Sequence, residues 1–463
     1  MRTIRSGVWL GLGLVCFLTS LAAQPQQLSG EWNLQTRMYG VAESNRLHVV
    51  QVDNALSGYV YEYGERVAIS GRVSGSKLVF SISQDWGLES FTGEVQSDAL
   101  SGGVEVKGKR PASGDWTAER IVTRTRPAQT FEFDPTQFHS ELSSTVPPAL
   151  RIFPGDSVHT RSIDAGGQDE AGARVAYGSN PLTGPFYVEG AMPGDVLAVT
   201  IKRLRLNRDW ATSDEALISK VLTSGYTSEH RQNWAATRWH LDREHNVATL
   251  EDAPPELKTF SVPLRPMLGG IGVAPEAGQP PLSTQDSGDL GGNLDCNQIT
   301  EGATVYLPVF QPGALLYLGD AHALQGDGEL NGNALETSMD IEFSVDVQRE
   351  KDIGGPRVEN HDYIMAIGLA GSLDAAIRLA TSDLARWIEN DYKLTGPGVA
   401  AVLGTSTEYS ISEMPDRNVG IVAKLRKQAL ALIHPMPRRI DKSMRDTPGQ
   451  SATSSLVRET GSW

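Results

Sequence analysis

The chain has 463 residues, of which 40% are hydrophobic and 21% are charged, with 47 Gly and 25 Pro. This length exceeds what one hydrophobic core usually supports, so we expect two domains, and the composition excludes disorder, collagen and a long coiled coil. The 41 Lys and Arg against 56 Asp and Glu give a net charge of −15. Such acidity excludes a basic nucleic-acid footprint and argues against anionic membranes as partners.

Residues 1–23 have the pattern of an export signal. Arg2 and Arg5 precede an apolar run over residues 8–18, and Leu21-Ala22-Ala23 offers the small residues of a cleavage site. We therefore expect an exported protein, periplasmic or secreted, that makes no membrane contact after cleavage. The alternative is an N-terminal anchor that is never cleaved.

Residues 24–126 show short alternating runs, such as 58–63 and 77–82, separated by glycine turns. Runs at 8–12-residue spacing are typical of antiparallel strands in a meander or small barrel, and the pattern resembles a lipocalin-like β domain. Trp32 and Trp116 are expected to close one end of it. Such a domain either holds a ligand or acts as a spacer.

The second predicted domain, residues 127–434, begins within a linker expected at 125–136 and is again rich in strand patterns. We expect a mainly β fold with a minority of helices, a β-rich α+β class. The strand-like segments are residues 150–164, 187–205, 304–310, 314–318 and 341–347.

Helices are predicted only late in the chain. Apolar residues recur at helical spacing from Leu373 to Ile388, with Ser372 as the N-cap. A second helix is predicted to start at Pro397 and a third to cover residues 419–432. The last segment, residues 435–463, lacks periodicity and is predicted to be a disordered tail.

The densest polar constellation lies in two glycine-rich segments, residues 291–298 and 319–329. The second offers five potential ligands directly after an apolar strand: Asp320, His322, Gln325, Asp327 and Glu329. Carboxylate and imidazole together suit a borderline cation such as zinc. The alternative is that the aspartates are turn residues and that His322 is a hydrogen-bonded core histidine.

Other hydrolytic motifs are missing from the sequence, which has no Gly-x-Ser-x-Gly, no His-Glu-x-x-His and no Walker-type loop. Of the two cysteines, Cys16 lies in the export signal, so Cys296 has no partner for a disulfide after cleavage. Cys296 is therefore either a nucleophile with His322 as its base or a small buried thiol.

Five motifs in the same order resemble the acetamidase/formamidase family across residues 128–430. They are 180–195, 270–275, 291–295, 307–314 and 319–329. The resemblance implies a β-rich, homo-oligomeric hydrolase that cleaves the C–N bond of small linear amides to a carboxylate and ammonia. It also implies a divalent metal cofactor, which we expect to be zinc.

The resemblance assigns metal ligation to three residues of this chain. Asp295 belongs to the Gly-Gly-Asn-x-Asp motif, His322 to the Gly-Asp-x-His motif, and His139 is the expected third ligand. The chain departs from the family where relatives carry a His-Asn-x-Trp sequence, because it has His139-Ser-Glu-Leu. A second departure is Met267-Leu268, where many relatives have a histidine. Both departures concern substrate identity, and the first also concerns His139.

The resemblance also implies four catalytic residues. Glu189 is assigned as general base with Glu329 as its alternative, and Asn293 and Gln325 are assigned to donate to the developing oxyanion or to orient the amide. Two other functions stay open at this point. One is a binding protein that has lost catalysis, and the other is a metallohydrolase of a larger amide or ester.

Overall fold

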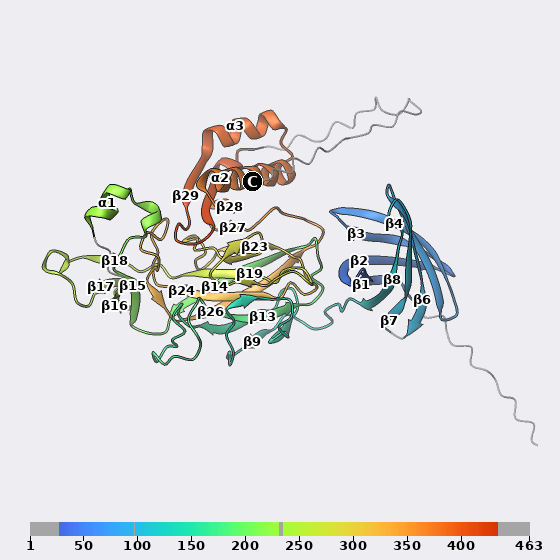
Figure 1. Ribbon diagram of the computed structural model, residues 1–463, viewed down its shortest axis with the longest axis horizontal. Helices are drawn as coiled ribbons and strands as arrows, with labels where there is room; N and C mark the ends of the chain where they lie inside the picture. The colour runs from blue at the N-terminus through green and yellow to red at the C-terminus, as the bar shows by residue number, and fades with distance from the viewer. Residues whose placement is uncertain (1–26, 97, 231–234, 434–463) are drawn as a thin grey trace, which may run out of the picture.

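The computed structural model describes residues 27–96, 98–230 and 235–433, which form two β-rich units (Figure 1). The predicted export signal and the predicted tail lie outside the described residues. None of the helices in the described ranges is both long enough and apolar enough to cross a bilayer.

The first unit is a closed antiparallel barrel in which each strand pairs with the next and the last pairs with the first. Its strands are β1 (Gly30–Met38), β2 (Val41–Val52), β3 (Ala55–Glu62), β4 (Glu65–Ser74), β5 (Lys77–Gln84), β6 (Gly87–Gln96), β7 (Ala99–Gly108) and β8 (Ala112–Arg120). The predicted small barrel is thus confirmed.

Side chains pack the interior of this barrel. Trp32 and Trp116 are fully buried there, and the Trp116 ring meets the rings of Phe80 and Phe91 edge-on, with centroids 5.5 and 5.8 Å away. Each indole N–H donates to a backbone carbonyl. This satisfies the polar end of an otherwise apolar side chain.

The barrel contacts the second unit through a buried ion pair. Arg46 of β2 donates to Asp195 at 2.6 Å and to the carbonyl of Gly190 at 3.0 Å, and both charged side chains are almost wholly buried. Burial raises the pKa of Asp195, and the charge of Arg46 opposes that shift. Tyr59 adds a hydrogen bond to Glu350 at 3.0 Å.

The second unit consists of two large sheets. The nine strands of one run, in spatial order, β29 (Thr407–Ile411), β30 (Val419–Arg426), β28 (Tyr363–Ala370), β27 (Arg357–Glu359), β23 (Thr304–Pro308), β14 (Val196–Leu206), β26 (Met339–Gln348), β12 (Ser157–Ser162) and β9 (Thr130–Glu132). The β9 strand pairs parallel to β12, so part of the predicted linker is an edge strand.

The other sheet carries the central strands of the candidate site. Its main order is β18 (Ser261–Pro263), β17 (Val247–Leu250), β16 (Ala236–Asp242), β15 (Trp210–Asp214), β25 (Glu336–Thr337), β24 (Leu316–His322), β19 (Met267–Val273), β22 (Gly291–Asn293) and β21 (Ser287–Gly288). Strand β13 (Leu182–Val188) also pairs with β24, and β11 (Leu150–Ile152) pairs with β13. A separate two-stranded sheet joins β10 (Glu141–Leu142) to β20 (Leu282–Ser283).

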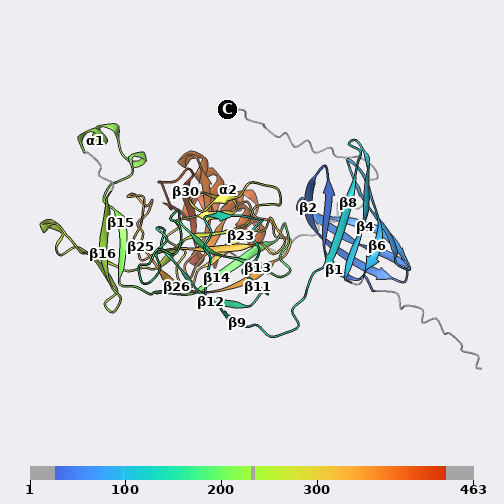
Figure 2. The ribbon, with the colours of Figure 1, turned by 60° about the horizontal axis from the view of Figure 1, so that its bottom comes forward.

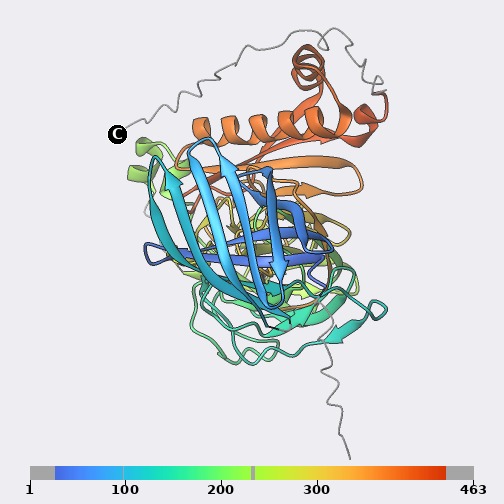
Figure 3. The ribbon, with the colours of Figure 1, turned by 90° about the vertical axis from the view of Figure 1, so that its right-hand side faces the viewer.

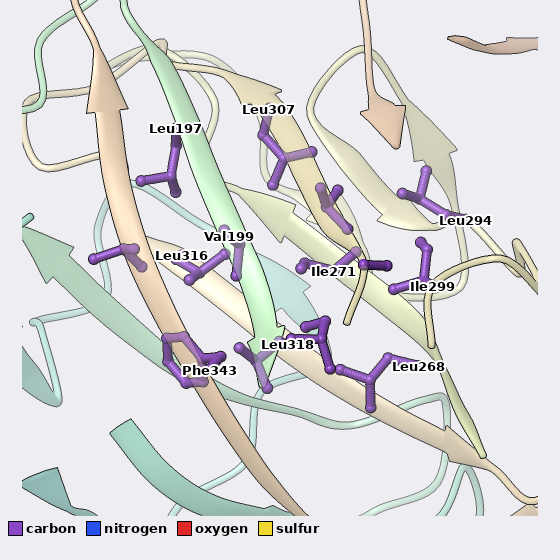
Figure 4. Packing of buried hydrophobic residues seen from close by; sticks show 14 of the residues in the cluster. Leu197, Val199, Leu268, Ile271, Leu294, Ile299, Leu307, Leu316, Leu318 and Phe343 are labelled. Atoms are coloured by element: carbon purple, nitrogen blue, oxygen red, sulfur yellow. The ribbon is translucent and has the colours of Figure 1, made fainter. Parts of the chain in front are cut away.

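The two large sheets pack face to face and enclose the main core. Figure 4 shows Val199 of β14 and Phe343 of β26 meeting Leu316 and Leu318 of β24. These four residues are completely buried and belong to one apolar cluster. The predicted mainly β fold is therefore confirmed.

Helix α2 (Leu373–Tyr392) covers one face of the first large sheet along β28 and β30, and α3 (Gly396–Ser406) packs beside α2 (Figures 1 and 3). Shorter helical segments are α1 (Ser224–Glu229), α4 (Lys427–Leu430), η1 (Ser219–Val221) and η2 (Pro255–Leu257). The predicted N-cap holds, because the Ser372 hydroxyl accepts from the Ala375 N–H. Leu373 and Ile377, predicted on the buried face, are 36% and 37% exposed.

The helix predicted over residues 419–432 is wrong. Residues Val419–Arg426 form strand β30, which pairs with both β28 and β29, and only the short α4 follows it. The strand is buried on both faces, so its sequence is a nearly continuous apolar run. Periodicity does not distinguish such a run from a buried helix.

Strands β15 to β18 and helix α1 extend from the end of the sandwich that faces away from the barrel (Figures 1 and 2). We call this part, residues 210–230 and 235–263, the extension. Its sheet is continuous with the strands of the candidate site, because β15 pairs with β25 and β25 pairs with β24.

Candidate metal centre

Strand β24 brings two potential ligands into the middle of the sandwich. Asp320 and His322 lie at the C-terminal end of this strand, and both residues are about 1% exposed. The neighbouring strand β25 places Glu336 directly opposite His322. The His322 Nε2 atom lies 3.1 Å from Glu336 Oε1 and 3.5 Å from Asp320 Oδ1.

Loops from distant parts of the chain add further carboxylates around this histidine. Asp295 Oδ1 lies 3.8 Å from His322 Nδ1. We call the whole set the His322 cluster, and its potential ligand atoms form three overlapping groups within 4.8 Å: Asp295, His322 and Glu329; Asp320, His322 and Glu336; and Asp295, Glu413 and Asp416.

Three acids of the cluster have left-handed backbone conformations. Their φ angles are 38° at Asp295, 55° at Asp320 and 45° at Glu329. This region is uncommon for residues other than glycine and costs about 1–3 kcal/mol when the surrounding structure enforces it. With these conformations, Asp320 in β24 and Asp295 and Glu329 in loops turn their carboxylates toward one histidine.

A glycine in the adjacent strand leaves the space into which these side chains point. A Cβ at Gly269 of β19 would lie 2.5 Å from Asp295 Oδ1, 2.6 Å from Asp320 Oδ2 and 2.9 Å from His322 Cε1. No real Cβ tolerates such contacts. The three side chains can therefore occupy this space only because residue 269 has no side chain.

Several potential ligand atoms in the cluster are buried and have no hydrogen-bond partner among the described residues. They are Asp295 Oδ1, Asp320 Oδ1, His322 Nε2, Glu336 Oε2 and Glu413 Oε2. A buried polar atom without a partner costs about 1–3 kcal/mol, and more when it is charged. Their convergence fits a cation that accepts several lone pairs at once.

Hydrogen bonds of Gln325 decide which nitrogen of His322 carries the hydrogen of the neutral ring. The Gln325 amide group donates to the carbonyls of Asp295 at 2.5 Å and Ser412 at 3.1 Å. Its Oε1 atom therefore faces His322 Nδ1, 2.9 Å away, and accepts the hydrogen of that nitrogen. In the neutral ring this leaves the Nε2 lone pair directed at the carboxylates, as in a metal-ligating histidine.

Asn293 fixes the positions of two of the acids by hydrogen bonds. Its amide group donates to Asp295 Oδ2 at 2.6 Å and to Asp416 Oδ2 at 3.0 Å. Its Oδ1 atom accepts from Asn180 at 3.0 Å. The N–H groups of Asn293 and Gln325 are thus engaged within the protein, which favours positioning over direct donation to an oxyanion.

Burial raises the pKa values of several acids of the cluster. For Asp295 the pKa rises well above its usual range because of burial and then the neighbouring Glu329 and Asp320 charges. Burial likewise raises the pKa of Glu329 to about 8 and raises that of Glu336. The cluster therefore carries more negative charge than its surroundings stabilise.

The histidine responds in the opposite sense. Burial lowers the pKa of His322, but the carboxylates of Glu336 and Asp320 outweigh burial and raise it well above its usual value. In the absence of another cation, a proton on the ring offsets part of the carboxylate charge. A divalent cation would supply that positive charge in place of the proton.

The structure does not bring two of the expected site residues to the cluster. His139, a predicted ligand, is half-buried beside the Tyr317 ring at 5.8 Å and belongs to none of the three ligand groups. Burial lowers its pKa. Glu189, the predicted general base, instead pairs with Arg151 at 2.7 Å. Its carboxylate is committed to that guanidinium next to Gly190, which contacts the barrel.

Sequence analysis did not select Glu336, Glu413 and Asp416 as site residues, and it named Asp320 without assigning it a role. Glu413 and Asp416 lie in the loop that follows β29, far along the chain from His322. The available signal was the pair of acids beside Pro415 before an apolar run. Glu336 has no local signal, because only strand register places it opposite His322.

Cys296 is a buried thiol. It is 1% exposed, and burial raises its pKa to about 11. Because the raised pKa keeps the thiol protonated at neutral pH, we expect iodoacetamide at pH 7.5 to leave Cys296 of the native protein unmodified and to label it after unfolding in guanidinium. Peptide mass spectrometry measures both. Rapid labelling of the native protein would contradict this reading of the site.

The fold and the His322 cluster define a β-sandwich protein whose buried donor set fits a divalent cation. One imidazole and several carboxylates would hold it, and this mixture suits zinc and neighbouring transition metals. The model of the Acetamidase/Formamidase family matches residues 127–281 and 277–364, just over half of the chain. The chain therefore belongs to the acetamidase/formamidase family, as the motifs predicted.

Individual relatives agree with this membership. The chain is 27% identical over 250 residues to a formamidase of Methylophilus methylotrophus. The match covers 42% of this chain and 60% of that protein. It is 26% identical over 221 residues to an acetamidase of Mycolicibacterium smegmatis, 36% of this chain and 53% of that one. The matched part therefore spans less than two thirds of these curated relatives.

Solved structures show the same sandwich. A predicted acetamidase/formamidase from Thermoanaerobacter tengcongensis superposes with a TM-score of 0.57 and 27% identity, covering 66% of this chain and 99% of that one. An acetamidase from Yersinia enterocolitica gives a TM-score of 0.57 and 27% identity over 66% of this chain and 94% of that one.

The departure at Met267-Leu268 lies within the site. Met267 pairs directly with His322 across β19 and β24 and is completely buried. Directly opposed residues of an antiparallel pair project from the same face of the sheet. A methionine here therefore places an apolar side chain on the face that carries the cluster histidine.

Proposed function

We propose that this chain is a metal-dependent hydrolase that cleaves the C–N bond of linear amides to a carboxylate and ammonia. The observation that carries the proposal is the convergence of unpartnered buried donor atoms on His322 in a member of the acetamidase/formamidase family. The overall reaction consumes one water molecule per amide. It needs a nucleophile, positive charge near the carbonyl oxygen and a proton for the leaving nitrogen.

The proposed ligands of the cation are His322, Asp320, Glu336 and Asp295. When bound, a divalent cation acidifies a water molecule and polarises a carbonyl group. Gln325 fixes the ring of His322, and Asn293 fixes the carboxylate of Asp295. These two amides are positioning residues in our scheme.

Glu329 is the proposed proton carrier. Its Oε1 atom accepts from the Ala334 N–H at 2.8 Å, which holds the carboxylate in place, and it shares a ligand group with Asp295 and His322. In this role it removes a proton from the attacking water and passes it to the amide nitrogen as the C–N bond breaks. Such general acid–base transfer typically contributes ~10²–10⁴-fold to the rate.

The test combines metal analysis with turnover. We expect the purified protein to contain a divalent metal, to lose it with its ammonia release from acetamide and formamide on chelation, and to regain both on addition of Zn²⁺ or another divalent ion. A metal-bound protein that hydrolyses no amide would favour the binding-protein alternative. Unchanged turnover after complete metal removal would contradict metal dependence.

We also propose that the mature protein is exported and forms a homo-oligomer. The charged and apolar pattern of residues 1–23 supports export. The same preparation tests both statements, since its N-terminal sequence and its mass in solution can be measured beside its metal content. An uncleaved N-terminus or a monomeric mass would contradict the respective statement.

A further inference from the structure

An apolar groove of about 310 Å³ opens beside the His322 cluster. It lies between the extension and the segment that follows β24. Its apolar lining comes from both parts: Leu217, Trp239, Phe260, Leu324, Leu330 and Leu335.

The groove reaches the candidate site through two residues. Gln325 and Glu329 line it together with the apolar side chains. Gln325 is hydrogen-bonded to His322, and Glu329 shares a ligand group with His322 and Asp295. A molecule lying in the groove therefore contacts residues that also belong to the site.

Several side chains of the apolar lining are exposed to solvent. Phe260 is 45% exposed, Leu330 44% and Leu217 37%. Trp239 is held in place, because its N–H donates to Ser213 at 3.0 Å and its ring meets that of Phe260 with centroids 6.4 Å apart. Contiguous exposed apolar side chains beside polar groups are typical of a binding site.

The size of the groove selects among amides. Acetamide has a single methyl group to place against this lining, and formamide has none. With either amide bound, most of the apolar surface of the groove would remain in contact with water. A phenyl or branched alkyl group would cover it. An apolar pocket gains about 10–200-fold in specificity for each methylene group that it binds.

We propose that the groove binds the bulky apolar substituent of the amide substrate, an aryl or branched alkyl group, while the amide itself reaches the His322 cluster. This inference rests on the proposed function, because it names the substrate class of that same site. The reaction stays balanced: water adds its oxygen to the carbonyl carbon, the C–N bond breaks, and the nitrogen leaves as ammonia or as an amine carrying the remaining protons.

The bulky group can belong to the acyl side or to the nitrogen side of the amide, and two isomers distinguish these cases. The compounds 2-phenylacetamide and acetanilide have the same atoms but carry the ring on opposite sides. We expect kcat/KM for one of them to exceed that for acetamide by about 10–100-fold with the metal-loaded protein. Equal or lower values for both isomers, with acetamide hydrolysed, would overturn the inference and leave the proposed function intact.

Substitution of exposed groove residues supplies the second arm. In the Leu217→Ser/Phe260→Ser double variant, the ratio of kcat/KM for the preferred isomer to that for acetamide should fall about 10–100-fold. The matched control is Leu379→Ser/Leu432→Ser, because these leucines are 53% and 79% exposed but lie outside the groove. An unchanged ratio in the groove variant, or an equal fall in the control, would overturn the inference.

A third measurement needs no turnover. Binding of the preferred isomer should change the intrinsic fluorescence of the wild-type protein, and the change should be reduced in Trp239→Phe.

The mass of the groove variant in solution is measured in parallel. If the groove substitutions dissociate an oligomer and leave substrate preference unchanged, the groove is a subunit contact and the substrate proposal is wrong. If no amide of any size is hydrolysed, the proposed function itself fails.

Discussion

Replacing His322 with alanine is expected to remove the bound cation and the amide hydrolysis together. The variant loses the nitrogen ligand whose lone pair faces the carboxylates, so the remaining acids face one another without that ligand. A cation that polarises a carbonyl supplies several kcal/mol of transition-state stabilisation, so kcat/KM should fall by ~10³-fold or more. Metal content by elemental analysis and ammonia release measure the two effects.

The control for this variant is His361→Ala, because the His361 side chain is 97% exposed and lies outside the His322 cluster. Thermal unfolding separates loss of binding from loss of folding. Added metal should raise the Tm of the wild-type protein and of His361→Ala, since a ligand that binds only the native state stabilises it, but it should not raise that of His322→Ala. A His322→Ala protein that retains metal and rate would refute the proposed centre.

Replacing Gly269 with alanine should impair both metal binding and hydrolysis through a single methyl group. That methyl would lie within 2.9 Å of Asp295, Asp320 and His322, so these three side chains must move apart or rotate away. We expect metal affinity and kcat/KM each to fall by about 10–100-fold, because misplaced ligands lower both affinity and rate. Elemental analysis and ammonia release again provide the measurement.

Gly288→Ala is the matched control for Gly269→Ala. Gly288 lies in β21 of the same sheet, and a Cβ there would have no neighbour within 4 Å. This variant should keep both metal and activity. If Gly269→Ala behaves like Gly288→Ala, the space beside residue 269 is not needed for the cation, and the proposed ligand geometry is incorrect.

The sequence was sufficient to predict the barrel and the amphipathic helix, because both depend on local periodicity. Alternating runs between glycine turns predicted the antiparallel strands of the first domain, and helical spacing after Ser372 predicted α2. The error over residues 419–426 has a physical cause. A strand paired on both sides and buried on both faces shows no alternation that would separate it from a buried helix.

The candidate site was predictable to the extent that short motifs carry its ligands. Asp295 and His322 lie in separate glycine-rich segments, and these meet because β22 and β24 both flank β19. Glu336 joins them only through the register of β24 and β25. Glu413 comes from a loop beyond β29, a long-range contact that spacing along the chain does not indicate.

The buried ion pair between Arg46 of the barrel and Asp195 of the sandwich links the two units by charge. Replacing Arg46 alone with an apolar residue would leave Asp195 buried with no counter-charge, an arrangement that costs about 3–5 kcal/mol in buried pairs that lose one partner. The contact between the barrel and the sandwich therefore depends on the charge of Arg46.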